Sequence, residues 1–303
     1  MNDILIRVTY LISIIALGYL LKKIGTFPDS TVNVLSKIIL RITLPATIVC
    51  SYAGKSFDTT LLIVPLIGFA ANMIYVIIML LIGKGQEPNN AAFDIVNTPG
   101  YNIGIFALPL LQSMFGASSA VVASLFDTGS SIISLGGSYS IALVIKNNDA
   151  FSFKKICLNL AKSVPLITCI VMLILSLSNI VLPHMFLEFA DILSDANVFL
   201  GMFMIGVAFR FEVQKTNLDR IIKILSVRYL VAIIIALICW YILPFDTMIK
   251  QIVVMLLFSP TAASSVAWTG ELNGDTGTAS AIGSISILCS ITVMILLLAS
   301  YNI

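Results

Sequence analysis

Long apolar segments separated by short polar breaks make up nearly the whole chain of 303 residues. A helix that crosses a bilayer needs about 20 apolar residues, and these segments run continuously rather than alternating as strands of a membrane barrel do. The pattern therefore predicts an all-α integral membrane protein with ten transmembrane helices. The predicted spans cover about 4–21, 30–53, 60–83, 91–115, 119–145, 156–182, 188–209, 219–243, 248–269 and 276–299.

The composition agrees with this pattern. Hydrophobic residues make up 59% of the chain and charged residues 11%, with a mean hydropathy of +1.05, whereas about 25% of a soluble domain is charged. A net charge of +2 is too small to indicate a nucleic-acid-binding protein, and one histidine cannot form a metal site. The five cysteines lie in or beside apolar stretches, so we expect no disulfide framework.

If the ten spans alternate in direction, most of the basic residues fall on one side of the membrane. One side would hold ten of them: Lys22, Lys23, Lys84, Lys146, Lys154, Lys155, Arg210, Lys215, Arg220 and Lys223. The other side would hold Arg7, Lys55 and Lys250, while Lys37, Arg41, Lys162 and Arg228 fall inside spans. Because positive loops stay cytoplasmic, we expect a multi-pass protein of the cell membrane with both termini outside and the linker 147–155 inside.

The even number of spans predicts two halves, residues 1–146 and 156–303, with five spans each. Since five is odd, the second half enters the membrane from the opposite side, as in the inverted repeats of secondary transporters. Weak identities recur at an offset of 161: Gly116–Ala120 aligns with Gly277–Ala281, Pro99 with Pro260, and Asp58 with Asp219. A chance match in a chain of this composition is the alternative.

The fourth and ninth predicted spans are interrupted near their middle. Pro99-Gly100, followed by Gly104, interrupts the fourth span, and Pro260 interrupts the ninth. Proline cannot donate the helical hydrogen bond, and glycine tolerates a positive φ. Unwound backbone in a membrane must line a cavity or bind something, so breaks at matching positions of two halves predict a binding site. Ordinary proline kinks are the alternative.

Several short segments resemble a known family. The segment Asn102–Leu110 is similar to the N-x-G-x-x-G-L-P-L region of the auxin efflux carrier family, with Ala107 where glycine is usual. The segment Asp127–Ser131 resembles a D-x-G-N motif of bacterial members, with Ser130 replacing the asparagine. Pro260 and the acidic loop Glu271–Asp275 are similar to that family's ninth span and the loop after it.

The resemblance implies a fold related to that of the bile-acid/sodium symporters, with spans four and nine crossing as broken helices. Spans 1, 2, 6 and 7 would form a scaffold, often dimeric, and spans 3–5 and 8–10 a domain that moves as an elevator. Substrates of the family are small organic anions, such as auxin, malate or malonate. The resemblance therefore implies a secondary active transporter in the lipid bilayer, with an organic anion as its substrate and a homodimer through the scaffold.

The broken helices supply the candidate substrate site. The second half of each would place a helix N-terminus, with free N–H groups and partial positive charge, at the membrane midplane. The candidate ligands of a carboxylate are Thr98, Tyr101, Asn102, Ser259, Thr261 and Ser264. Asn102 coincides with the family's crossover asparagine; a role only as the N-cap of its own helix is the alternative.

Four charged residues within spans are further candidates, because a charge in a membrane is costly unless it has a function or a partner. Asp127 would carry a proton or hold a cation, or else pair with Arg41 or Arg228. Either arginine would attract anions or extend its head to the inner interface, and we favour the interface for Arg228. Asp94, about one turn inside the cytoplasmic edge of its span, favours capping or anchoring at the membrane interface, with a proton relay as the alternative.

Two other functions remain as alternatives: an intramembrane enzyme with Asp94 and Asp127 as an acid pair, and a sensor or channel built on a transporter fold. The sequence carries no H-E-x-x-H motif and no phosphate-binding loop, and Asp275 lacks the G-x-G-D context of membrane aspartyl proteases. We therefore expect no enzyme and no cofactor, with H⁺ or Na⁺ as the candidate coupling ion.

Overall fold

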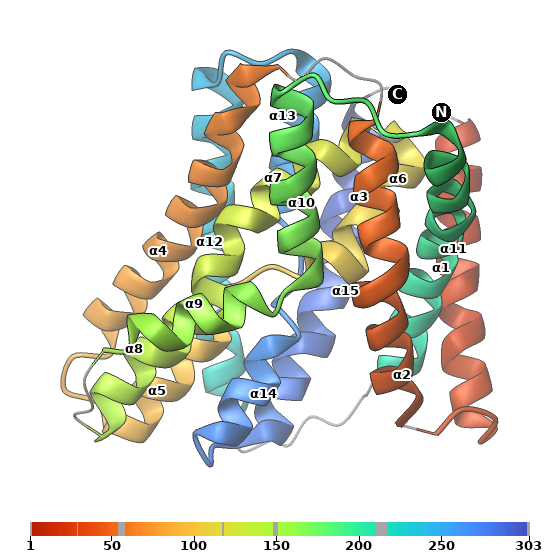
Figure 1. The fold of residues 1–303 in the computed structure, drawn as a ribbon. Helices are drawn as coiled ribbons and strands as arrows, with labels where there is room; N and C mark the ends of the chain where they lie inside the picture. The colour runs from red at the N-terminus through yellow and green to blue at the C-terminus, as the bar shows by residue number, and fades with distance from the viewer. Residues whose placement is uncertain are drawn as a thin grey trace.

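The computed structural model describes residues 2–28, 30–53, 58–116, 118–147, 151–209 and 217–301. Every regular element in these residues is a helix (Figure 1). Six continuous helical stretches are long and apolar enough to cross a membrane, or seven if the bent pair α9–α10 is one span. The protein is thus an all-helical, multi-pass membrane protein, while the count of ten spans and the inverted repeat stay predictions.

The elements follow the predicted spans closely. In chain order they are α1 Asn2–Lys23, α2 Ser30–Ile38, η1 Ile39–Thr43, α3 Leu44–Tyr52, η2 Thr59–Leu62, α4 Ile63–Ile82, α5 Pro88–Asn97, η3 Ile103–Ala107, α6 Leu108–Phe115, α7 Ser118–Ile132, η4 Ile133–Gly137, α8 Ser138–Asn147, α9 Phe153–Ala161, α10 Val164–Leu177, α11 His184–Ala208, α12 Leu218–Ile242, α13 Thr247–Leu257, α14 Ser264–Glu271 and α15 Thr276–Ser300. Of the η elements, η1, η3 and η4 are π-helical and η2 is a 3₁₀ turn.

Both predicted interruptions are present. Residues 98–102 are non-helical between α5 and η3, and residues 258–263 lie between α13 and α14, with no regular helix. Proline stands in each gap, so neither helix can continue through it. The fourth and ninth predicted spans are therefore pairs of short helices.

The sixth predicted span differs from the prediction. Instead of one helix over 156–182, α9 and α10 meet at a bend of 77°, and α9 runs obliquely across the bundle (Figure 1). Pro165 is the second residue of α10, and Ser163 before it has an extended backbone. Proline is favoured in the first turn of a helix, so Pro165 suits the start of a new helix after the extended Ser163.

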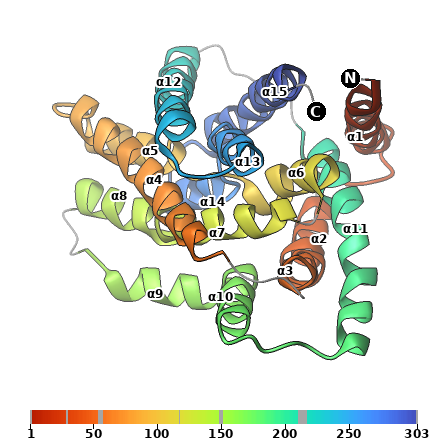
Figure 2. The same cartoon turned by 90° about the horizontal axis from the view of Figure 1, so that it is seen from above.

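The helices pack in two groups, which Figure 2 shows from above. In the first, α1 packs along α11, and α3 packs against both α10 and α11. In the second, α4 packs along α7, α5 along α8, and α12 against α4, α13 and α15. The groups meet mainly where α3 and α10 contact α7 and where α11 contacts α6. We call the end where α1 begins and α15 ends the terminal end, and the end where α8 and α14 end the linker end (Figure 1).

Two loop carboxylates cap the helices that follow them. Asp58 accepts a hydrogen bond from the Thr60 N–H at 2.9 Å, and Asp275 from the Thr278 N–H at 3.0 Å. These donors hold the pKa of each carboxyl below its usual range, because they stabilise the ionised form. Both caps therefore carry a negative charge at neutral pH.

Some residues used in the predicted orientation and repeat lie outside the described residues. They are Lys55, Ala117, Arg210, Lys215 and residues 148–150 of the predicted linker.

Glycines allow the closest helix contacts. A Cβ atom on Gly129 of α7 would lie 1.8 Å from the Pro65 carbonyl oxygen of α4, and one on Gly206 of α11 would lie 2.0 Å from the Ile15 oxygen of α1. No side chain fits at such distances, so each group is held by a backbone-to-backbone contact that only glycine permits.

We expect Gly129→Ala to force α4 and α7 apart and to lower the free energy of unfolding by about 1–3 kcal/mol or more. The measurement is the thermal unfolding midpoint in detergent, followed by circular dichroism. Gly270→Ala is the control, because a Cβ there meets only the Thr276 methyl group at 3.6 Å. An unchanged midpoint for Gly129→Ala would contradict the packing argument.

Candidate functional site

The two breaks touch each other. The Asn102 N–H of the first break donates to the Pro260 carbonyl of the second at 2.9 Å. Gly100 has a φ of +88°, and a Cβ atom there would lie 2.8 Å from the Ala262 Cβ. Only glycine has both the left-handed backbone and the small volume that this contact needs. The chain therefore brings its two unwound segments together.

A buried arginine of α12 stabilises both breaks. Arg228 has an exposed fraction of 1%, and its guanidinium donates to the Thr98 carbonyl at 2.7 Å and to the Ser259 and Pro260 carbonyls at 2.8 and 3.1 Å. The same group stands 4.8 Å from the centre of the Tyr101 ring. A planar group with several fixed donors can bond to carbonyls of two segments at once, and the aromatic ring adds a cation–π contact.

The prediction that Arg228 extends to the inner interface is wrong. Its alternative, a pair with Asp127, is not formed either, because the hydrogen bonds of the guanidinium go to backbone carbonyls. The breaks leave carbonyl groups without helical partners inside the protein, where each unpaired group costs free energy. These carbonyls attract the side chain inward more strongly than the interface does.

Asn72 of α4 stabilises the first break from the other side, and sequence reasoning missed it. Its side-chain oxygen accepts a hydrogen bond from the Gly100 N–H, while its nitrogen donates to the Gly68 carbonyl and to the Ser130 hydroxyl. Asn72 is fully buried. A lone asparagine within an apolar span was the available signal.

A cavity of about 410 Å³ opens beside the two breaks. It lies between α2, η1, α9 and α10 on one side and the breaks with α7 and η4 on the other. Six predicted site residues line it: Arg41, Tyr101, Asn102, Gly104, Asp127 and Ser264. Other polar lining residues, not chosen as site residues from the sequence, are Ser36, Lys37, Ser131, Ser134, Asn159, Lys162 and Ser163.

Two helix beginnings face this cavity. Ile103, Gly104 and Ile105 line it at the start of η3, and Ala262, Ala263 and Ser264 line it at the start of α14. The first four N–H groups of a helix have no partner within the helix, and they carry partial positive charge. The cavity therefore receives backbone donors from both broken spans.

All three π-helical segments in the described residues contribute lining residues as well: Leu40 and Arg41 from η1, Ile103 to Ile105 from η3, and Ser134 and Leu135 from η4. Such segments are rare and are often found at functional sites. Their gathering around one cavity supports its choice as the candidate site.

Asn102 and Asp127 are two predicted polar residues that line the cavity. The Asn102 side chain makes no capping hydrogen bond to its helix, so its alternative role as an N-cap is not observed. Asp127 has no ion pair or side-chain hydrogen bond within the described parts of the chain, although it shares the cavity with Arg41. Both side chains are available to a ligand.

Three predicted ligands differ in position from the prediction. Thr98, Ser259 and Thr261 are buried and do not line the cavity. The Thr98 hydroxyl donates back to the Asp94 carbonyl at 2.8 Å, and the Thr261 hydroxyl lies 3.2 Å from that of Ser286. Their backbones, with Pro99 and Pro260, shape the breaks, while their side chains turn into the protein.

Asp94 is placed away from the cavity. It is 1% exposed, is bonded by the Lys223 ammonium group and lies 3.7 Å from the Arg220 guanidinium. Both cations come from α12, so Asp94 fastens α5 to that helix, a role that differs from the expected capping or anchoring at the membrane interface. Because Asp94 and Asp127 lie in different surroundings, the acid pair of an intramembrane enzyme is not assembled.

Replacing Arg228 is expected to release both breaks. Arg228→Met removes donors from three buried carbonyls, each of which costs about 1–3 kcal/mol when unsatisfied, so the unfolding midpoint in detergent should fall strongly. Arg228→Lys should recover part of the loss, because it keeps the charge but not the planar set of donors. Arg41→Met is the matched control, expected to be stable because Arg41 is exposed; equal stability of the Arg228 and Arg41 variants would contradict the assignment.

Comparison with known proteins places the chain in a family. No curated protein matches it significantly. The sequence profile of the membrane transport protein family, however, matches residues 3–298, nearly the whole chain. Together with the helical bundle, its paired breaks and the cavity between its two groups of helices, this match shows that the chain belongs to the membrane transport protein family, which is the auxin efflux carrier family that its motifs resemble.

Proposed function

We propose that the protein is a secondary active transporter that carries a small organic anion, a mono- or dicarboxylate or an auxin-like acid, across the cell membrane. One observation carries this proposal: two helix beginnings and the cationic side chains of Lys37, Arg41 and Lys162 converge on one cavity. Helix N-termini bind carboxylates through backbone N–H groups, and basic side chains add attraction at a distance.

The charge and size of the cavity support a small anion. Its lining has three basic side chains and one acidic one, Asp127, a difference of two positive charges. Its volume of about 410 Å³ is at the lower end of the range of about 300–1,000 Å³ that is typical of ligand pockets. A small carboxylate with Asn102 as a hydrogen-bond donor fits these features, whereas the Ser264 hydroxyl already donates to the Ser134 carbonyl at 3.1 Å.

An elevator mechanism is supported by the two groups of helices. In this proposal α1–α3 and α9–α11 form the scaffold, and α4–α8 with α12–α15 move as one body. Arg228, Asn72 and the Asn102–Pro260 hydrogen bond tie the breaks to the second group, so the binding groups would move together. The inverted repeat is part of this proposal, and dimerisation through the scaffold stays a prediction.

The proposed orientation places the linker end in the cytoplasm, following the distribution of basic residues. The cavity extends from the breaks toward Ser36 and Asn159, which belong to the linker half of the bundle. On this orientation the described conformation faces the cytoplasm.

Protons are the proposed coupling ion, with Asp127 as the carrier. An unpaired carboxylate inside a membrane protein is costly as an anion, so a proton accompanies it when the cavity is closed. Sodium is less well supported, because Arg228 already neutralises three carbonyls of the breaks. Carbonyls are the ligands a sodium ion would need.

Transport into liposomes tests the function. Purified protein in liposomes is expected to accumulate radiolabelled malonate, or another small carboxylate, under an imposed pH or potential gradient. Asn102→Ala should lower kcat/KM about tenfold, the effect of losing one hydrogen bond to a charged group.

The control for this measurement is Asn89→Ala, which alters an exposed asparagine at the start of α5 and should transport normally. If no mono- or dicarboxylate moves under any pH, sodium or potential gradient, the carrier proposal is wrong. Unchanged transport by Asn102→Ala would remove Asn102 from the site while leaving the carrier proposal intact.

Asp127→Asn is expected to abolish the dependence of transport on a pH gradient, because an amide cannot bind and release the proton. Exchange of labelled for unlabelled anion at equal pH should continue. The measurement compares uptake rates with and without an imposed pH gradient. Asp191→Asn, on the exposed side of α11, is the control; an unaltered pH response in Asp127→Asn would exclude Asp127 as the proton carrier.

A further inference from the structure

Three cavities follow one another along the surface where α3 and α10 meet α7, which we call the seam. The 410 Å³ site cavity is lined by Leu44 of α3 and Asp127 of α7. A middle chamber follows at Ile48 and Thr128, and a terminal cavity of about 140 Å³ follows at Tyr52 and Val121. Successive turns of the same helices thus line successive spaces from the site to the terminal end.

The middle chamber restricts this line to a very small solute. Its volume is about 10 Å³, close to the least space that holds one water molecule. Asp127 lines both the chamber and the site cavity. In the described conformation the middle chamber is therefore too small for an organic anion beside Asp127 to pass along the seam.

A contact among three helices separates the chamber from the terminal cavity. The Cys169 sulfur of α10 lies 3.5 Å from the Tyr52 hydroxyl of α3 and 3.4 Å from the Thr128 hydroxyl of α7. Tyr52 and Cys169 are only 3% and 2% exposed. Tyr52 lines the terminal cavity and Thr128 lines the chamber, so this three-residue cluster is the wall between them.

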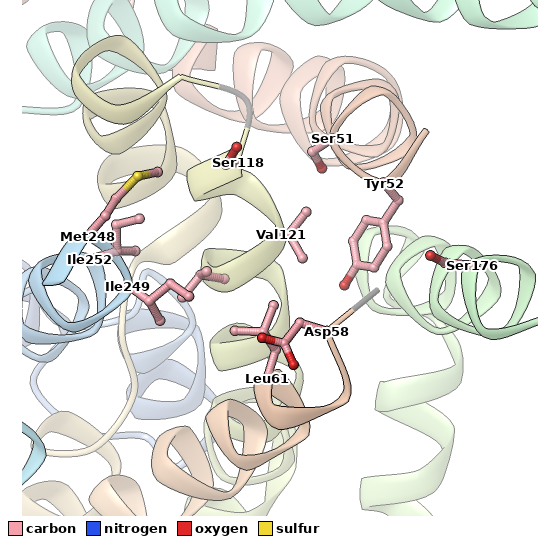
Figure 3. A pocket seen from close by; sticks show the side chains of 11 residues that line it. Ser51, Tyr52, Asp58, Leu61, Ser118, Val121, Ser176, Met248, Ile249 and Ile252 are labelled. Carbon is pink, nitrogen blue, oxygen red and sulfur yellow. The ribbon is translucent and has the colours of Figure 1, made fainter. Parts of the chain in front are cut away.

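The terminal cavity has a different character from the site cavity. Figure 3 shows Tyr52, Val121 and Leu61 around a common space, with Asp58 at its lower side. Among the residues that the structure describes, its lining is mostly apolar, with the Asp58 carboxylate and no basic side chain. An anion would gain little by staying there, so the cavity suits passage rather than binding.

We propose that the terminal cavity is the second mouth of the transport path, and that the Tyr52–Cys169–Thr128 cluster is the gate that closes this mouth in the described conformation. The proposal rests on the proposed carrier function. Movement of α7 along α3 and α10 toward the terminal end would separate Thr128 from Cys169 and bring Asp127 to the level that Val121 now holds beside Tyr52. Asp127 and Val121 are six residues apart, which is about 9 Å along the helix axis.

Reactivity of the native Cys169 tests the gate without any substrate. In a protein with the other four cysteines changed to serine, Cys169 should react slowly with a hydrophilic, membrane-impermeant methanethiosulfonate reagent. Tyr52→Ala in the same protein removes one wall of the gate, and the reaction should become at least about fivefold faster, the factor expected from the loss of one hydrogen bond.

Two further variants keep this test decisive. Tyr229→Ala removes another largely buried tyrosine, whose hydroxyl bonds to Ser286 away from the seam, and should leave the reactivity of Cys169 unchanged. If Tyr52→Ala does not fold, Tyr52→Phe removes only the hydroxyl and should give a smaller increase. An unchanged rate in the folded Tyr52 variant overturns the gate.

The second measurement follows labelling during malonate transport in liposomes. Cys169 should react faster while transport runs, whereas a protein with Cys239 alone, which is buried in α12 and lines none of the three cavities, should not. Continued transport with no faster labelling of Cys169 overturns the gate. Absence of transport in the wild-type protein instead overturns the carrier function, and the Tyr52 variants still decide whether the cluster closes the terminal cavity.

Discussion

The structure depends on satisfying the backbone of two unwound segments inside a membrane protein. Water is not there to bond to the freed N–H and C=O groups, and each unpaired group costs several kcal/mol. Arg228 bonds to carbonyls of both segments, and Asn72 accepts from the Gly100 N–H. With these bonds removed, neither break would be stable, and the helix beginnings that follow them would not face one cavity.

The positive charges of the protein fall into two sets, one that bonds to the backbone of the breaks and one that lines the cavity. The fixed guanidinium donates hydrogen bonds to the carbonyls, while the first residues of η3 and α14 line the cavity. In the proposed function Arg228 would contribute to anion binding only indirectly, by holding the breaks, while Lys37 and Arg41 line the cavity. Buried structural charge and ligand-facing charge are separate features of this protein.

Local covalent properties explain which features could be predicted from the sequence. Pro99 and Pro260 lack the N–H donor of a helical hydrogen bond in any surroundings, so the breaks were predictable, and so was the bundle of apolar helices. The direction of a side chain in an unwound segment has no helical periodicity, which is why Thr98 and Ser259 were expected in the cavity but turn inward. The family match supported the resemblance, but not these directions.

The contacts of Arg228 and the bend after α9 could not be predicted from the sequence, because both depend on tertiary packing. Depth within a span does not reveal which neighbours a side chain meets, and the carbonyls bonded by Arg228 come from segments about 30 and 130 residues away. Close packing is the rule in protein interiors, yet α3, α10 and α7 leave three spaces between them. Large interlocking side chains would hold two helix groups in one register, whereas an interface with small gaps and the short side chains of Ser124 and Thr128 is compatible with the proposed elevator movement.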